Sequence, residues 1–136
     1  MISPSRPDAA PDDRVREFFD AFVEAFRTFD GGVIASRYLP PYLAFHAPGS
    51  AQVFATGTDI AAYFQRILTD YHGRGCRSCR YEDLAVVPLG RDCVLATVTW
   101  ELLAEDGAVV SAWRESYNLC LVDGGYRVFA STDHAA

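Results

Sequence analysis

The sequence contains no lysine, so all 12 of its basic residues are arginines. These arginines are scattered along the chain, and the formal net charge is −6. Because nucleic acids are bound through clustered basic residues, we expect no nucleic-acid partner. Long apolar runs are also missing, and none approaches the roughly 18 residues that a membrane-spanning helix requires. We therefore expect no membrane partner.

The N-terminus lacks the apolar core of a secretory signal, which favours a cytoplasmic protein. Residues 1–13 are rich in Pro, Asp, Ser and Ala and cannot bury enough surface to offset the entropy of ordering. They are predicted to form a flexible tail. Residues 14–136 are predicted to form a single domain, because a chain that is 50% hydrophobic and 22% charged is typical of one globular fold at this length.

The four cysteines do not follow the spacing of a metal site. Cys76 and Cys79 form one C-x-x-C, but a zinc site usually requires a second such pair, and Cys93 and Cys120 stand alone in apolar segments. The C-x-x-C leads into a predicted strand, whereas a redox pair normally opens a helix. We expect no metal and no cofactor, and we interpret these cysteines as small apolar residues.

Apolar periodicity predicts three helices. The first spans residues 14–30 and carries a phenylalanine stripe, the second spans 33–39 and ends at Pro40-Pro41, and the third begins with Thr58 as N-cap and closes at Gly73 and Gly75. Two short strands, YLAFH and AQVFA, lie before the third helix. Four β-rich runs follow residue 75. This order predicts an α+β domain in which a curved antiparallel meander wraps around the first helix.

One of the predicted hairpins places a carboxylate on an apolar face. If Asp106-Gly107 is a two-residue turn, Trp100 lies opposite Trp113 and Val98 lies opposite Glu115. The other residues of that face are apolar or aromatic. Glu115 is therefore predicted to face the interior, either as a carboxylic acid with a raised pKa or as the partner of an arginine or a histidine.

The next turn leaves two alternatives. A two-residue loop at Asp123-Gly124 puts Tyr126, Val128 and Ala130 on the face of Glu115, and a three-residue loop puts Phe129, Ser131 and Asp133 there instead. We favour the three-residue loop, since two glycines permit a left-handed bulge.

The order of elements, the strand end FHAPG, the helix TGTDIAAYF and the hairpin ESYNLCLVDGGYRVFASTDH resemble the nuclear-transport-factor-2-like (NTF2-like) superfamily over residues 14–134, close to its SnoaL-like members. The resemblance implies a cone of curved sheet around three N-terminal helices, and a homodimer. Members include isomerases, dehydratases, hydrolases and cyclases, together with binding domains that catalyse nothing, so the fold alone does not select a function.

Within this resemblance, His46 stands near the general-base aspartate of ketosteroid isomerase. The first-helix tyrosine of that enzyme has no counterpart here, and its second acid would fall near Tyr117 or Asn118. Two functions stay open: cofactor-free acid–base catalysis on a small hydrophobic molecule, and a ligand-binding or dimerisation module without turnover. The candidate catalytic residues are His46, Glu115 and Tyr117, and the candidate ligand-binding residues are Phe22, Tyr38, Tyr63, Trp100, Trp113, Phe129 and Asp133.

Overall fold

The computed structural model describes residues 11–47 and 49–135. Three helices occur in these ranges: α2 (Pro11–Phe26), α3 (Gly31–Ala35) and α4 (Gly57–Gly73). None of them is both long and apolar enough to cross a membrane. The helix α2 begins three residues before the predicted domain boundary at residue 14, and the remainder of the predicted tail, residues 1–10, lies outside the described residues.

The helix ends differ from the predictions because capping side chains set them. Asp30 accepts hydrogen bonds from the backbone N–H groups of Gly32 and Val33, so α3 begins at Gly31 rather than at residue 33. Thr56 rather than Thr58 is the N-cap of α4, since its side chain accepts a hydrogen bond from the N–H of Asp59. The first predicted helix ends at Phe26 rather than at residue 30, and the second ends at Ala35 rather than at residue 39, because β1 begins at Tyr38.

Six strands form one sheet, and their bounds are β1 (Tyr38–His46), β2 (Ser50–Phe54), β3 (Ser78–Leu89), β4 (Cys93–Leu103), β5 (Val109–Val122) and β6 (Gly125–Asp133). Their order is β2-β1-β6-β5-β4-β3. Neighbouring strands are antiparallel except for β1 and β6, which run parallel. The sheet is therefore mixed. The three described helices are not all N-terminal, because β1 and β2 separate α2 and α3 from α4.

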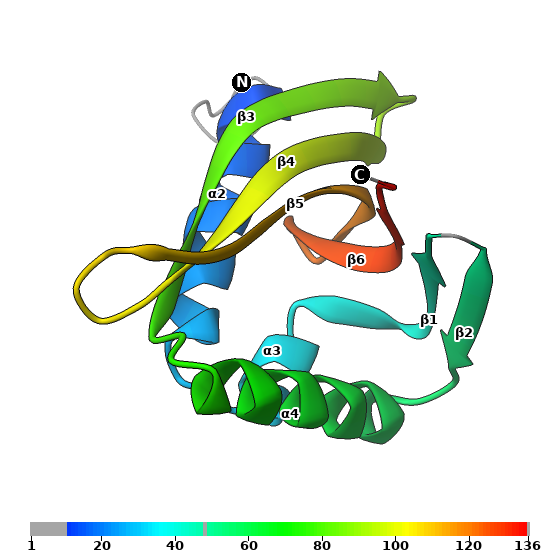
Figure 1. Cartoon of the computed structure of the whole chain (residues 1–136). Coiled ribbons are helices and arrows are strands. Elements are labelled where there is room, and N and C mark those ends of the chain that lie inside the picture. The colour runs from blue at the N-terminus through cyan, green and yellow to red at the C-terminus, as the bar shows by residue number, and fades with distance from the viewer. Residues whose placement is uncertain (1–10, 48, 136) are drawn as a thin grey trace.

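The curved sheet encloses the phenylalanine stripe of α2, as predicted (Figure 1). Phe19 is fully buried, and its ring centroid lies 5.4 Å from that of Tyr81, 5.9 Å from that of Trp100 and 5.6 Å from that of Tyr117. The helices α3 and α4 pack against each other across the open side of the sheet. The result is a cone with an aromatic interior.

The predicted β4–β5 register is confirmed, although the turn differs. Trp100 pairs with Trp113 and Val98 pairs with Glu115. The backbone N–H of Ala104 donates to the carbonyl of Ala108, which leaves three residues in the loop, 105–107, instead of two. The register shifts again between Leu102 and Leu103, and this bulge compensates for the extra loop residue.

In the β5–β6 hairpin the preferred three-residue loop is wrong, because Val122 pairs with Gly125 across the two-residue loop Asp123-Gly124. A bulge then shifts the register between Asn118 and Leu119. Beyond it, Glu115 pairs with Asp133. The interior face of β6 therefore combines the two loop alternatives. Tyr126 and Val128, expected from the two-residue loop, precede the bulge in the chain, and Ser131 and Asp133, expected from the three-residue loop, follow it.

Candidate functional site

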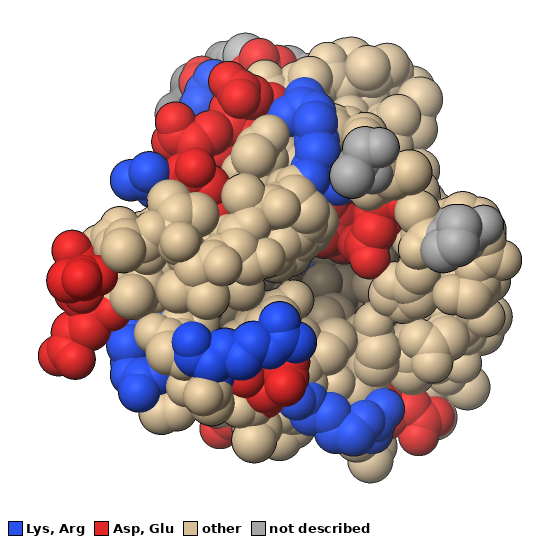
Figure 2. Space-filling model, viewed as in Figure 1, with Lys and Arg blue, Asp and Glu red and all other residues tan. Residues whose placement is uncertain are grey.

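The interior of the cone contains a cavity of about 210 Å³. Figure 2 shows its opening as a hollow in the middle of one face, with acidic side chains on one rim. Most of the lining is aromatic or aliphatic, and the polar side chains come mainly from β1, β5 and β6. The lining residues are Phe22, Phe26, Ile34, Tyr38, Tyr42, His46, Tyr63, Phe64, Ile67, Leu68, Tyr71, Cys79, Trp100, Leu102, Trp113, Glu115, Tyr117, Ser131 and Asp133.

Glu115 faces this cavity, as the strand alternation predicts. Its Oε1 accepts a hydrogen bond of 2.8 Å from Nε1 of Trp113, and its carboxyl group also interacts with the hydroxyl of Tyr117 and the carboxyl of Asp133. Burial, followed by the nearby negative charge of Asp133, raises the pKa of Glu115 to about 8. At neutral pH, Glu115 therefore holds a proton.

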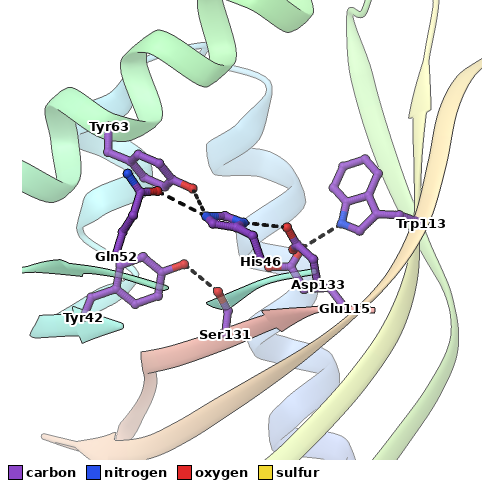
Figure 3. A network of polar contacts seen from close by, with 8 residues as sticks. All are labelled: Tyr42, His46, Gln52, Tyr63, Trp113, Glu115, Ser131 and Asp133. Atoms are coloured by element: carbon purple, nitrogen blue, oxygen red, sulfur yellow. Dashed lines mark hydrogen bonds and ion pairs between the residues drawn. The ribbon is translucent and has the colours of Figure 1, made fainter. Parts of the chain in front are cut away.

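His46, at the end of β1, contacts Asp133 at the end of β6. The two atoms, Nδ1 of His46 and Oδ2 of Asp133, lie 2.8 Å apart (Figure 3). The parallel pairing of β1 with β6 makes this contact possible, since it places Phe45 beside Thr132. An imidazole whose Nδ1–H donates to a carboxylate has its lone pair on Nε2, which is the arrangement of a general base.

Nε2 of His46 has a suitable partner in either protonation state. The hydroxyl of Tyr63 lies 3.2 Å away and can donate to the lone pair of the neutral imidazole. The Oε1 of Gln52 lies 3.3 Å away and can accept from the N–H of the imidazolium. The site can therefore support His46 both before and after it takes up a proton.

The tyrosine hydroxyls around the cavity are held by specific partners. The hydroxyls of Tyr42 and Ser131 lie 2.6 Å apart, and Nε1 of Trp100 donates to the hydroxyl of Tyr117 at 2.7 Å. Burial is the main cause that raises the pKa of Tyr63, to about 12, and also raises the pKa of Tyr117. These groups stay neutral hydroxyls that can donate hydrogen bonds.

Nine of the ten predicted site residues line the cavity, and Phe129 does not. Phe129 is the extra residue of the β6 bulge, so it has no pairing partner on β5 and is not one of the β6 residues that face the cavity. Its expected place on the cavity wall is therefore wrong. The cavity brings together all three predicted catalytic residues, His46, Glu115 and Tyr117.

Several lining residues were not predicted. Tyr42 shares the inward face of β1 with His46, so alternation could have identified it, and Ser131 was placed on the face of Glu115 by one of the two loop alternatives without being named as a site residue. The sequence contains no pattern that marks Gln52 as a partner of His46, because that contact depends on the β1–β2 register. Cys79 lines the cavity and Cys76 lies fully buried, as expected for small apolar residues, and burial raises the pKa of both thiols.

Residues 12–136 match the model of a family described as NTF2-like protein (DUF6841). The chain belongs to this NTF2-like family. This confirms the resemblance at the level of the superfamily. None of the curated proteins matches the sequence.

Solved structures support the same fold. An NTF2-like protein of unknown function from Shewanella oneidensis superposes with a TM-score of 0.72 at 11% identity, covering 91% of this chain and 98% of that one. An NTF2-like protein with a cystatin-like fold from Novosphingobium aromaticivorans gives 0.68 at 11% identity, covering 90% and 79%. A putative calcium/calmodulin-dependent protein kinase II association domain from Xanthomonas campestris gives 0.68 at 18% identity, covering 100% and 95%.

Proposed function

We propose that this NTF2-like protein is a SnoaL-like, cofactor-free acid–base catalyst that acts on a small hydrophobic molecule. The observation that carries the proposal is the placement of a His46–Asp133 pair beside the protonated Glu115, within one aromatic cavity. A base and an acid on one small enclosed surface suit isomerisation, dehydration or cyclisation, because each of these reactions moves a proton from one atom to another.

In the proposed reaction His46 removes a proton from a carbon of the substrate through Nε2. Asp133 holds the Nδ1–H, so that the imidazolium that forms stays paired with a carboxylate. For this step the substrate takes the place of the Tyr63 hydroxyl at Nε2, and Gln52 accepts the new N–H. The positive charge on His46 is then stabilised without any cofactor.

Glu115 acts as the acid and gives its proton to a heteroatom of the same substrate. Burial and the nearby negative charge of Asp133 keep this proton bound at neutral pH. The described lining of the cavity offers this carboxyl group neutral hydrogen-bond donors and no arginine. Tyr117 donates a hydrogen bond to the negative charge that develops on the substrate, and Trp100 holds its hydroxyl in position. The aromatic walls provide an apolar surface for the rest of the molecule.

Proton abstraction can be tested before the natural substrate is identified. The protein is incubated in deuterium oxide with one-ring ketones such as phenylacetone and cyclohexanone, and loss of the α-proton signals is followed by NMR. We expect exchange above the buffer rate and a loss of roughly 100-fold or more in His46→Asn, the usual contribution of a general base. The matched control is His72→Asn, because His72 is exposed on α4 and does not line the cavity. Equal exchange in both variants, or none in the wild type, would refute catalysis.

A specific observation favours a second candidate, a dimerisation or binding module without turnover. The outer face of β1 and β2 exposes Leu43 and Phe45, each at 40%, and Val53 at 68%. Further along this face the residues are of mixed polarity, including Leu95, Thr97 and Asn118. Apolar surface of this kind suits a contact between two copies, so we also propose a homodimer. One solved neighbour carries the name of an association domain.

A further inference from the structure

The polar part of the cavity has an unequal number of acids and bases. Two carboxyl groups, Glu115 and Asp133, face one imidazole, His46, and no arginine is among the lining residues of the described chain. When His46 is an imidazolium it balances only one carboxylate, the one that it contacts directly. The hydrogen bonds to Glu115 come from neutral groups, Trp113 and Tyr117. When both carboxyl groups are ionised, the site thus lacks one positive charge, and a proton on Glu115 makes up for it in the free protein.

We infer that the ligand of this cavity carries a basic nitrogen, and that this nitrogen lies between Glu115 and Asp133 as an ammonium group. The inference rests on the proposed function in one respect, namely that the ligand occupies this cavity. It adds the chemical class of the ligand: a small one-ring amine. The atom that accepts the proton of Glu115 is then a nitrogen.

The backbone places the two carboxyl groups for this role. Glu115 and Asp133 are direct partners across β5 and β6 and both line the cavity, and the effect of Asp133 on the pKa of Glu115 favours a proton shared between the two carboxyl groups. An ammonium group carries three N–H donors and can replace that shared proton while contacting both carboxylates. Oε1 of Glu115 keeps its bond from Trp113, and Oδ2 of Asp133 keeps its bond to His46.

Aromatic rings on the same side of the cavity also suit a cation. Tyr71 of α4 and Trp113 of β5 both line the cavity, and their ring centroids lie 6.2 Å apart. Because Trp113 also donates to Glu115, these rings lie next to the carboxyl pair. Aromatic faces next to carboxylates are the usual surroundings of bound organic ammonium ions. Figure 2 shows acidic side chains at one edge of the hollow and basic side chains below it. The net charge of −6 favours the approach of a cation over that of an anion.

The proton balance of binding is simple. A neutral amine takes the proton of Glu115 and stays as an ammonium–carboxylate pair, whereas an amine that arrives already protonated releases the Glu115 proton to solvent. Only N–H and O–H bonds change. The raised pKa of Glu115 agrees with a site that holds this proton until a cation replaces it. The titratable groups around Glu115 are Tyr38, Tyr42 and His46 of β1, Tyr63 and Tyr71 of α4, Tyr117 of β5, and Asp133 of β6.

The size of the cavity limits the ligand to about one ring. About 210 Å³ holds about seven water molecules at roughly 30 Å³ each. Three probes of matched shape therefore test the inference: 2-phenylethylamine, 2-phenylethanol and phenylacetate. They present a cation, a neutral hydroxyl and an anion on the same ring.

Isothermal titration calorimetry of the full chain with these probes, in two buffers of different ionisation enthalpy, measures both affinity and proton release. We expect the amine to bind at least tenfold more tightly than the alcohol at pH 8, and phenylacetate to bind least. At pH 7 the amine should release close to one proton per site and the alcohol none, because Glu115 has a pKa of about 8. Glu115→Gln should reduce the preference for the amine to less than threefold. Its matched control, Glu82→Gln, makes the same substitution on the exposed surface of β3 and should keep the preference.

Each contrary result has a definite meaning. If the alcohol or phenylacetate binds as well as the amine, the amine class is wrong while a small-molecule cavity stands. If the preference survives in both Glu115→Gln and Asp133→Asn, the nitrogen does not lie between these carboxyl groups. If no probe binds to the folded protein, the inference is overturned, and ketone exchange then decides the proposed catalysis separately.

Discussion

The partly buried carboxyl group of Glu115 should make the stability of the protein fall as the pH rises. Its pKa is about 8 in the folded state and 4.5 as the ordinary value. Because the folded pKa is the higher one, the favourable contribution is complete below pH 4.5 and is lost as the pH rises through 8. Between these limits the free energy of unfolding falls by about 1.4 kcal/mol per pH unit, which amounts to about 3.5 kcal/mol from pH 5 to pH 8.

Urea unfolding of the wild type and of Glu115→Gln at pH 5, 6, 7 and 8 measures the contribution of Glu115 to the free energy of unfolding. Glutamine keeps the shape and the acceptor for Trp113 but cannot ionise, so its advantage over the wild type should grow by about 3.5 kcal/mol across the series. Taking the difference between the two proteins removes the titration of the other groups. Glu82→Gln, on the exposed surface of β3, should instead run parallel to the wild type. Parallel profiles for the wild type and Glu115→Gln would refute a raised pKa at Glu115.

Two further predictions concern the helices and the outer face of the sheet. Gly31→Ala should lower the free energy of unfolding by about 3 kcal/mol in urea denaturation, because the new Cβ would lie 2.3 Å from the carbonyl oxygen of Ala61. The control is Gly57→Ala, whose new Cβ meets nothing within 4 Å. It should change the free energy of unfolding by less than about 0.5 kcal/mol. Equal effects would mean that α3 and α4 do not pack this closely. Sedimentation at tens of micromolar, roughly the range of an ordinary weak interface, should show a dimer that Leu95→Arg dissociates. A wild-type monomer at that concentration would rule out the proposed outer-face interface.

The sequence by itself determined the class of the fold and most of the cavity wall. Residues on a strand alternate between its two faces, so the pairing of Trp100 with Trp113 was enough to place Glu115 and Tyr117 inside. The phenylalanine period of α2 likewise identified the helix that the sheet must cover. This information is local, because each conclusion depends on residues in one helix or in one hairpin.

The bulges were decided by the tertiary structure. Sequence rules give the turn residues but do not say where a strand gains an unpaired residue, and one such residue reverses the facing of all that follow it. At the β4–β5 turn the bulge cancelled the error in loop length, so the predicted register was right. A second bulge, at Phe129 of β6, took this predicted site residue away from the cavity wall. The same bulge turned Asp133 inward, although the loop has only two residues.

The contact between His46 and Asp133 was also decided only by the tertiary structure. These residues stand 87 positions apart, and they meet because β1 enters the sheet parallel to β6 at the edge of the meander. No local pattern specifies that pairing, since it depends on how the whole sheet closes around α2. The sequence could therefore supply the histidine and the carboxylates separately, while only the closed cone shows that they form one site.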